Sequence, residues 1–113
     1  MKTQPGGNFV LYVSDQSFAT SQVDITIRID GRVAVIDQFA VGNEHNWKRY
    51  RFELDPGMHR LTAVSHDGRA RLVGTFRVKK TLNGVVDYVY SPGNPGGDRK
   101  LTFTHTPDQI AFA

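Results

Sequence analysis

The sequence predicts an all-β protein with the architecture of an antiparallel sandwich, and three observations support this prediction. Apolar and polar residues alternate with a period of two along several segments, as they do in strands with one buried face. Asp-Gly, Asn-Gly and Asp-Pro-Gly turns separate these segments at intervals of roughly ten residues, which is typical of sandwiches and small barrels. No window carries the apolar stripe of an amphipathic helix.

The composition indicates one globular domain. The chain has 113 residues, 39% hydrophobic and 22% charged, which is enough for a single core. We predict one domain over residues 1–113, with a flexible segment at 1–8. The start of the chain lacks the apolar core of a signal peptide. No apolar run approaches the ~20 residues that span a membrane, so we expect no membrane insertion.

Charge and cysteine content narrow the function classes. The chain has no cysteine, which excludes disulfides, thiolate metal ligands and cysteine nucleophiles. The formal net charge of +3 is a modest basic bias. Such a bias favours a solvated surface over nucleic-acid binding, and we expect no nucleic-acid partner.

The β-rich runs define the expected strands. In chain order they are 9–14, 23–29, 32–41, 49–54, 59–65, 69–78, 85–90 and 101–105. Within them, the alternation assigns one apolar set to the inner face. We expect the core to contain Ile25, Ile27, Ile29, Phe52, Leu54, Leu61, Leu72 and Phe76.

Turn lengths predict how three of these strands pair. A two-residue loop at Asp67-Gly68 pairs Ser65 with Ala70, Ala63 with Leu72 and Leu61 with Gly74. A four-residue loop at 55–58 pairs Leu61 with Phe52. Both registers keep the apolar residues on one face, as a half-buried sheet requires. We therefore predict a three-stranded meander over residues 47–78.

The Asp30-Gly31 turn poses a separate problem of register. A two-residue loop there would leave both Val33 and Val35 on the outer face. A three-residue loop over 30–32 returns both valines to the inner face, and we predict that loop.

Two histidines and two aspartates between residues 54 and 68 raise the question of a metal site. The meander places His59 on the inner face, opposite Phe76, and His66 at the hairpin tip on the other face. The two imidazoles therefore do not converge, and Asp55 and Asp67 occupy positions that aspartate favours in turns. We predict no zinc site and no cofactor. Aspartates in the loops leave a calcium site open.

No motif for catalysis is present. The chain has no GxSxG elbow, P-loop or GxGxxG, and the glycine-rich stretch 93–97 does not lead into a helix. A pair of glycosidase carboxylates stays open, although no feature of the sequence points to one. We interpret the protein as a non-enzyme.

The outer face of the predicted meander is the candidate binding surface. There the sole tryptophan lies among arginines, an arrangement suited to stacking on a sugar, to cation–π contact or to a protein interface. The residues assigned to this surface are Trp47, Arg49, Arg51, His66, Arg69 and Arg71. The alternative is that Trp47 is covered by a second layer or packs on arginine stems.

Tyrosines near the long loop 91–100 have a structural interpretation. Tyr88 and Tyr90 alternate with Asp87, so we expect both rings to face inward and Tyr88 to anchor a corner. Their position next to the Gly/Pro-rich loop leaves a binding role open.

Two stretches, VDITIRIDGRVAV and FELDPGMHRLTAVS, resemble the small immunoglobulin-like and PEGA-like β-modules of bacterial envelope proteins. The shared pattern is a strand that ends in Asp-Gly, a later strand, a Pro-Gly-x-His turn and an alternating strand. It covers roughly residues 23–65. The PEGA tetrapeptide itself is absent. The resemblance implies a non-catalytic accessory or adhesion module in an extracytoplasmic setting.

We therefore predict an immunoglobulin-like antiparallel β-sandwich of seven or eight strands. The expected function is a binding module for a protein or cell-envelope partner, acting through the outer face of the 47–78 meander. The alternative is a carbohydrate-binding module that uses Trp47 and loop 91–100 to hold a polysaccharide.

Overall fold

The computed structural model describes residues 7–16, 22–40, 48–90 and 99–107. Strands account for 76% of these residues and no helix occurs among them, which confirms the prediction of an all-β fold. The strands are β1 (Phe9–Asp15), β2 (Gln22–Ile29), β3 (Arg32–Ala40), β4 (Lys48–Phe52), β5 (Gly57–Ser65), β6 (Ala70–Val78), β7 (Leu82–Val89) and β8 (Lys100–Thr106). In this part of the chain we find no helix long and apolar enough to cross a membrane.

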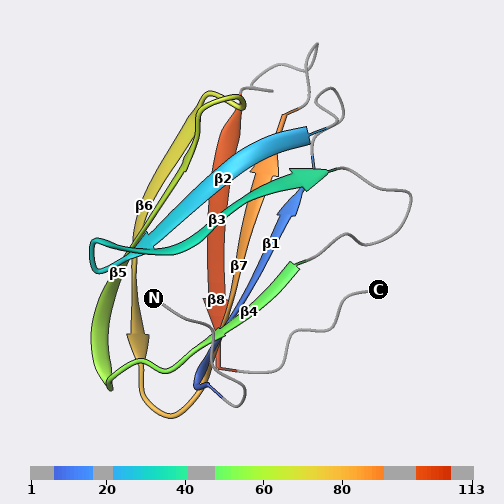
Figure 1. Ribbon diagram of the computed structural model, residues 1–113. Helices are drawn as coiled ribbons and strands as arrows, with labels where there is room; N and C mark the ends of the chain where they lie inside the picture. The colour runs from blue at the N-terminus through green and yellow to red at the C-terminus, as the bar shows by residue number, and fades with distance from the viewer. Residues whose placement is uncertain (1–6, 17–21, 41–47, 91–98, 108–113) are drawn as a thin grey trace.

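The strands form two four-stranded sheets that face each other (Figure 1). One sheet has the order β4-β1-β7-β8 and the other the order β3-β2-β5-β6. The inward side chains of both sheets form a single hydrophobic cluster. At its centre Phe76 stacks on Phe9 from the opposite sheet, with ring centroids 4.6 Å apart. Of the eight residues predicted for the core, seven are buried and Leu72 is half-buried against the cluster.

The prediction of a wholly antiparallel sandwich is wrong at one pair of strands. β1 runs parallel to β7, with Phe9 opposite Leu82 and Val13 opposite Val86. No hairpin joins these strands, because five others lie between them in the chain. Their relative direction is therefore free of the antiparallel constraint that a short turn imposes.

The predicted three-stranded meander is also wrong, because β4 belongs to the other sheet. β4 pairs antiparallel with β1, where Phe52 lies opposite Phe9. Residues 53–56 carry the chain across from β4 to β5 in place of a hairpin. The inward face of β4 contacts the same core from the opposite layer, so Phe52 is buried as predicted, and so is Leu54 just after the end of the strand.

Residues 7 and 8 are held against the end of β4, although we expected them in a flexible segment. The Asn8 side-chain amide donates to the Leu54 carbonyl at 2.7 Å, and its Oδ1 accepts from the Leu54 backbone N–H at 2.8 Å. Gly7 is buried beside this contact, and a Cβ there would lie 2.5 Å from the Phe52 carbonyl oxygen. This close approach of two backbones requires glycine.

The β5–β6 hairpin has the predicted register. Ser65 lies opposite Ala70, Ala63 opposite Leu72 and Leu61 opposite Gly74. The inner face continues to the far end of the hairpin, where His59 lies opposite Phe76 as predicted.

The β2–β3 turn resolves the valine register differently from the prediction. It is a two-residue turn at Asp30 and Gly31, whose φ angles of 52° and 83° suit an Asp-Gly pair, and Ile29 lies opposite Arg32. A bulge follows, so that Val35 faces Ile27 and Val33 faces Arg28. As a result Val35 is 3% exposed and Val33 38% exposed. The bulge, not a longer loop, returns one valine to the core.

Candidate functional site

The two sheets divide the predicted binding surface. Arg49 and Arg51 lie on β4 beside Tyr12 and Val10 of β1. The tip of the β5–β6 hairpin contains His66 and Arg69, and the start of β6 contains Arg71. This hairpin belongs to the other sheet. The common face that we predicted for these arginines therefore does not exist. Trp47 lies outside the described residues, as does loop segment 91–98.

The His59 ring contacts two chain reversals, through Asp30 and through Asp55. Its Nδ1 is 2.6 Å from the Asp30 carboxylate, and its Nε2 is 2.7 Å from the Asp55 carbonyl oxygen. Both partners are acceptors, so both ring nitrogens donate when the two bonds form, and the ring is then an imidazolium. Neither nitrogen is left to hold a metal or to move a proton for a substrate. The ring also stacks on Phe76 at 5.6 Å.

The electrostatics of this contact favour the charged pair. Burial alone would lower the pKa of His59, but its hydrogen bonds to Asp30 and to the Asp55 carbonyl, with the charge of both aspartates, outweigh burial and raise it. Burial would raise the pKa of Asp30, and the Arg60 backbone N–H and His59 together lower it instead. The sequence placed His59 correctly but did not reveal Asp30 as its partner.

Asp24 organises the β5–β6 turn from the neighbouring strand. Its carboxylate accepts the backbone N–H groups of His66 at 3.0 Å and Asp67 at 2.7 Å, and the Ser65 hydroxyl at 3.3 Å. Burial works against the charged form, but these hydrogen bonds lower the pKa of Asp24 overall. Both oxygens of this carboxylate therefore accept hydrogen bonds from the turn.

Among the described ranges, no three His, Asp or Glu side chains are grouped so as to hold a metal ion.

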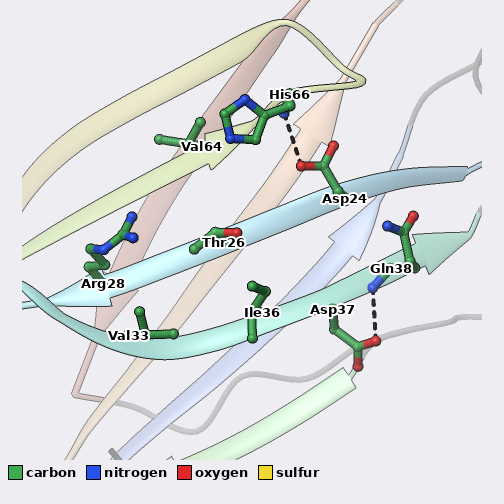
Figure 2. Close-up of a pocket in the computed structure, with 9 residues that line it drawn as sticks. All are labelled: Asp24, Thr26, Arg28, Val33, Ile36, Asp37, Gln38, Val64 and His66. Atoms are coloured by element: carbon green, nitrogen blue, oxygen red, sulfur yellow. Dashed lines mark hydrogen bonds between the residues drawn. The ribbon is translucent and has the colours of Figure 1, made fainter.

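A groove follows β2 on the outer face of the β3-β2-β5-β6 sheet, with a volume of about 560 Å³ (Figure 2). We call it the β2 groove. Its floor is the small side chain of Thr26, which pairs with Ile36 on β3 and with Val64 on β5. Larger side chains on the flanking strands thus form walls on both sides of Thr26. Arg28 lies at one end of the groove, and Asp24 with His66 at the other.

The walls of the β2 groove are apolar and open to solvent. Ile36 is 74% exposed, more than any other large hydrophobic residue in the described part of the chain. Val33, which pairs with Arg28, is 38% exposed. Val73 on β6 is 52% exposed and belongs to the same cross-strand row, because Arg28 pairs with Thr62 and Thr62 pairs with Val73. Exposed aliphatic side chains that share one face are a feature of interaction surfaces.

Four arginines surround this apolar strip: Arg28, Arg60, Arg71 and Arg77. All four side chains are exposed. The ion pairs of the described residues are Lys48–Asp37 and His59–Asp30, so none of the four guanidinium groups has an acidic partner there. We call the four arginines, the exposed residues Val33, Ile36 and Val73, and the half-buried Val64 the basic-apolar face.

Asp37 borders the β2 groove but does not neutralise it. Its carboxylate accepts the Lys48 ammonium group at 2.9 Å and turns away from the groove toward β4 (Figure 2). The Lys48 hydrogen bond lowers the pKa of Asp37, while burial and the negative charge of Asp37 raise the pKa of Tyr50 to about 12. This contact joins the edges of the two sheets and directs the Asp37 carboxylate away from the basic-apolar face.

Sequence reasoning missed the β2 and β3 half of this surface. The sequence feature that could have revealed this half is the run RVAVIDQFAV, in which apolar residues occupy both faces of one strand. A strand with two apolar faces at the edge of a sandwich must expose one of them, which in this sheet is the face of Ile36 and Val33.

Comparisons of this chain with protein-family models, with curated proteins and with solved structures found no match. Its function is therefore inferred from its own residues.

Proposed function

We propose that the protein is a non-catalytic binding module that recognises an acidic surface of a partner protein through the basic-apolar face. The observation that carries this proposal is the combination of exposed aliphatic side chains with four arginines that have no acidic partner among the described residues. A monomer gains nothing from leaving both features on one face. A partner that supplies carboxylates and an apolar patch complements both.

The aliphatic residues and the arginines have different energetic roles. Burial of the aliphatic strip supplies affinity, because apolar area leaves water. The arginines supply orientation and association rate, since complementary charge steers encounter more than it strengthens the final complex. Arginine is also the cation most suited to carboxylates, through its planar fork of donors.

Two further observations support a binding role over catalysis. Both ring nitrogens of His59, the half-buried histidine, are engaged by Asp30 and Asp55. The resemblance to immunoglobulin-like and PEGA-like envelope modules supports the same non-catalytic role, a cell-envelope partner and an extracytoplasmic setting.

The test uses the full chain as bait together with two charge-matched double variants. Arg28→Glu/Arg71→Glu reverses two charges on the basic-apolar face. Arg49→Glu/Arg51→Glu makes the same change in net charge on β4, in the other sheet. A partner captured by the wild type is identified, produced separately and titrated against all three proteins.

We expect the first double variant to weaken binding by at least about tenfold, because each reversed charge then repels the carboxylates of the partner, and the β4 variant to keep wild-type affinity. Binding should also weaken as salt rises, because exposed charges are screened within ~8 Å at physiological ionic strength. Equal loss in both variants, or no loss in either, contradicts the proposal. Salt-insensitive polysaccharide binding that Trp47→Ala abolishes supports the carbohydrate alternative instead.

A further inference from the structure

We infer that the β2 groove binds an extended peptide segment in which an aliphatic side chain and an acidic side chain are two positions apart. This inference rests on the proposed function and names the chemistry that the basic-apolar face would recognise. The aliphatic side chain lies over Thr26, and the carboxylate lies on Arg28.

The shape of the groove determines the aliphatic position. Thr26 has a small outward side chain, and Ile36 and Val64 stand on either side of it. A side chain from a partner therefore meets apolar surface on both flanks only at this point. The Thr26 methyl group adds apolar surface to the floor, and with the two walls it favours a branched aliphatic side chain over a charged one.

The position of Arg28 determines the acidic residue. Thr26 and Arg28 are two residues apart on β2 and point to the same face, so their side chains are separated by about 6.8 Å along the strand. An extended peptide that follows β2 has the same repeat, and its side chains at i and i+2 also share a face. Arg28 has no acidic partner among the described residues, and a carboxylate at this position forms a bidentate pair.

The other end of the groove limits the orientation of the peptide. Asp24 lies there, and its carboxylate is held by the His66 and Asp67 backbone N–H groups. An acidic residue of the peptide is repelled from this negative charge and attracted to Arg28 at the opposite end. The groove is therefore electrically asymmetric along β2, and one orientation of an aliphatic-x-acidic segment is favoured over the reverse.

The test is a selection of displayed random heptapeptides on the immobilised full chain. We expect the enriched peptides to share an aliphatic residue two positions from Asp or Glu. A synthetic peptide of the enriched sequence is then titrated against the wild type and against variants of the groove. Thr26→Trp fills the floor, Arg28→Glu reverses the charge at the end, and Ile36→Ala removes one wall.

Two of the three groove variants, Thr26→Trp and Arg28→Glu, have matched controls outside the groove. Thr75→Trp adds the same bulk as Thr26→Trp but on β6, and Arg49→Glu makes the same charge change as Arg28→Glu but on β4 of the other sheet. We expect the groove variants to lose at least about tenfold in affinity and the controls to lose less than about threefold. Ile36→Ala guards against misfolding as an explanation, because truncating a side chain that is 74% exposed leaves the core intact.

The outcomes separate this inference from the proposed function. Enriched peptides without the aliphatic-x-acidic spacing, or peptides insensitive to all three groove variants, overturn the inference alone. If no peptide is enriched but a captured partner still depends on Arg28 and Arg71, the protein recognises a folded surface. That outcome also overturns the inference of a peptide ligand. No enriched peptide and no partner dependent on these arginines overturns both. Arg28-dependent adsorption to vesicles of phosphatidylserine and phosphatidylcholine, without peptide binding, would likewise overturn both.

Discussion

The Tyr88 hydroxyl donates a hydrogen bond of 3.0 Å to the Gly68 carbonyl oxygen, and both groups are buried. The bond joins β7 of one sheet to the β5–β6 turn of the other. It fulfils the sequence-based expectation that Tyr88 faces inward and anchors a corner. The same turn is held by Asp24 and by Ser65, whose hydroxyl accepts the Gly68 N–H at 3.0 Å.

Tyr88→Phe should lower the free energy of unfolding by about 1–2 kcal/mol, because the ring stays while a buried carbonyl loses its donor. Chemical denaturation of wild type and variant measures the difference. Tyr50→Phe is the control, since its hydroxyl is 3.4 Å from the exposed Asp37 carboxylate and should contribute less. Equal effects in the two variants would show that the Tyr88 bond does not stabilise the corner.

Gly68→Ala should destabilise the protein by about 1–3 kcal/mol through overpacking. A Cβ at this position would lie 2.5 Å from Cε1 of Tyr88 and 2.6 Å from Oγ of Ser65. Thermal melts should therefore show a smaller cost of Gly68→Ala in a Tyr88→Leu background, where the ring is gone. An unchanged cost in that background would locate the strain elsewhere in the turn.

The His59–Asp30 pair should make stability fall as pH rises above neutrality. The pKa of His59 is raised in the folded protein, so its contribution is fully present below the unfolded value of 6.5 and is lost as pH rises through the folded value. Asp30 works in the opposite direction: its pKa is lowered, so its contribution is present above 3.8 and is lost as pH falls through the folded value. The stability contributed by this pair should therefore be greatest between pH 3.8 and pH 6.5, the two unfolded pKa values.

Melting temperatures measured from about pH 4 to about pH 8.5 check this expectation. His59→Gln should remove most of the fall above neutrality. His66→Gln is the matched control, since the hydrogen bonds of that exposed histidine are made by its backbone groups, and it should keep the wild-type profile. A profile that is the same in His59→Gln and wild type would contradict the assignment.

Phe76→Ala should cost about 3–5 kcal/mol, the usual range for removing a core aromatic. The ring is 1% exposed and contacts Phe9, Phe103 and His59. On the same strand, Val73 is 52% exposed, and Val73→Ala should change stability by no more than ~0.5 kcal/mol. Denaturant titrations of the two variants give the comparison, and similar losses would mean that the interior is not centred on Phe76.

The sequence by itself determined which residues face the core and where several chain reversals occur. Side-chain period in a strand is two, so alternation at Ile25, Ile27 and Ile29 assigns the buried face without reference to any partner strand. The Asp67-Gly68 turn is equally local, because loop length and turn chemistry set the register of the hairpin that it closes. Both features follow from a few neighbouring residues.

Only the tertiary structure decided which strands are neighbours, and with them the candidate site. The alternation around Tyr50 and Phe52 fits either sheet, because both sheets direct an apolar face to the same core. In the structure β4 pairs with β1, so Arg49 and Arg51 do not lie on the predicted surface. The two-residue turn left Val33 outward beside Arg28, and the bulge at Ala34 returned Val35 to the core. A groove needs a small residue between larger ones on three adjacent strands, and strand order is a property of long-range packing that local periodicity does not encode.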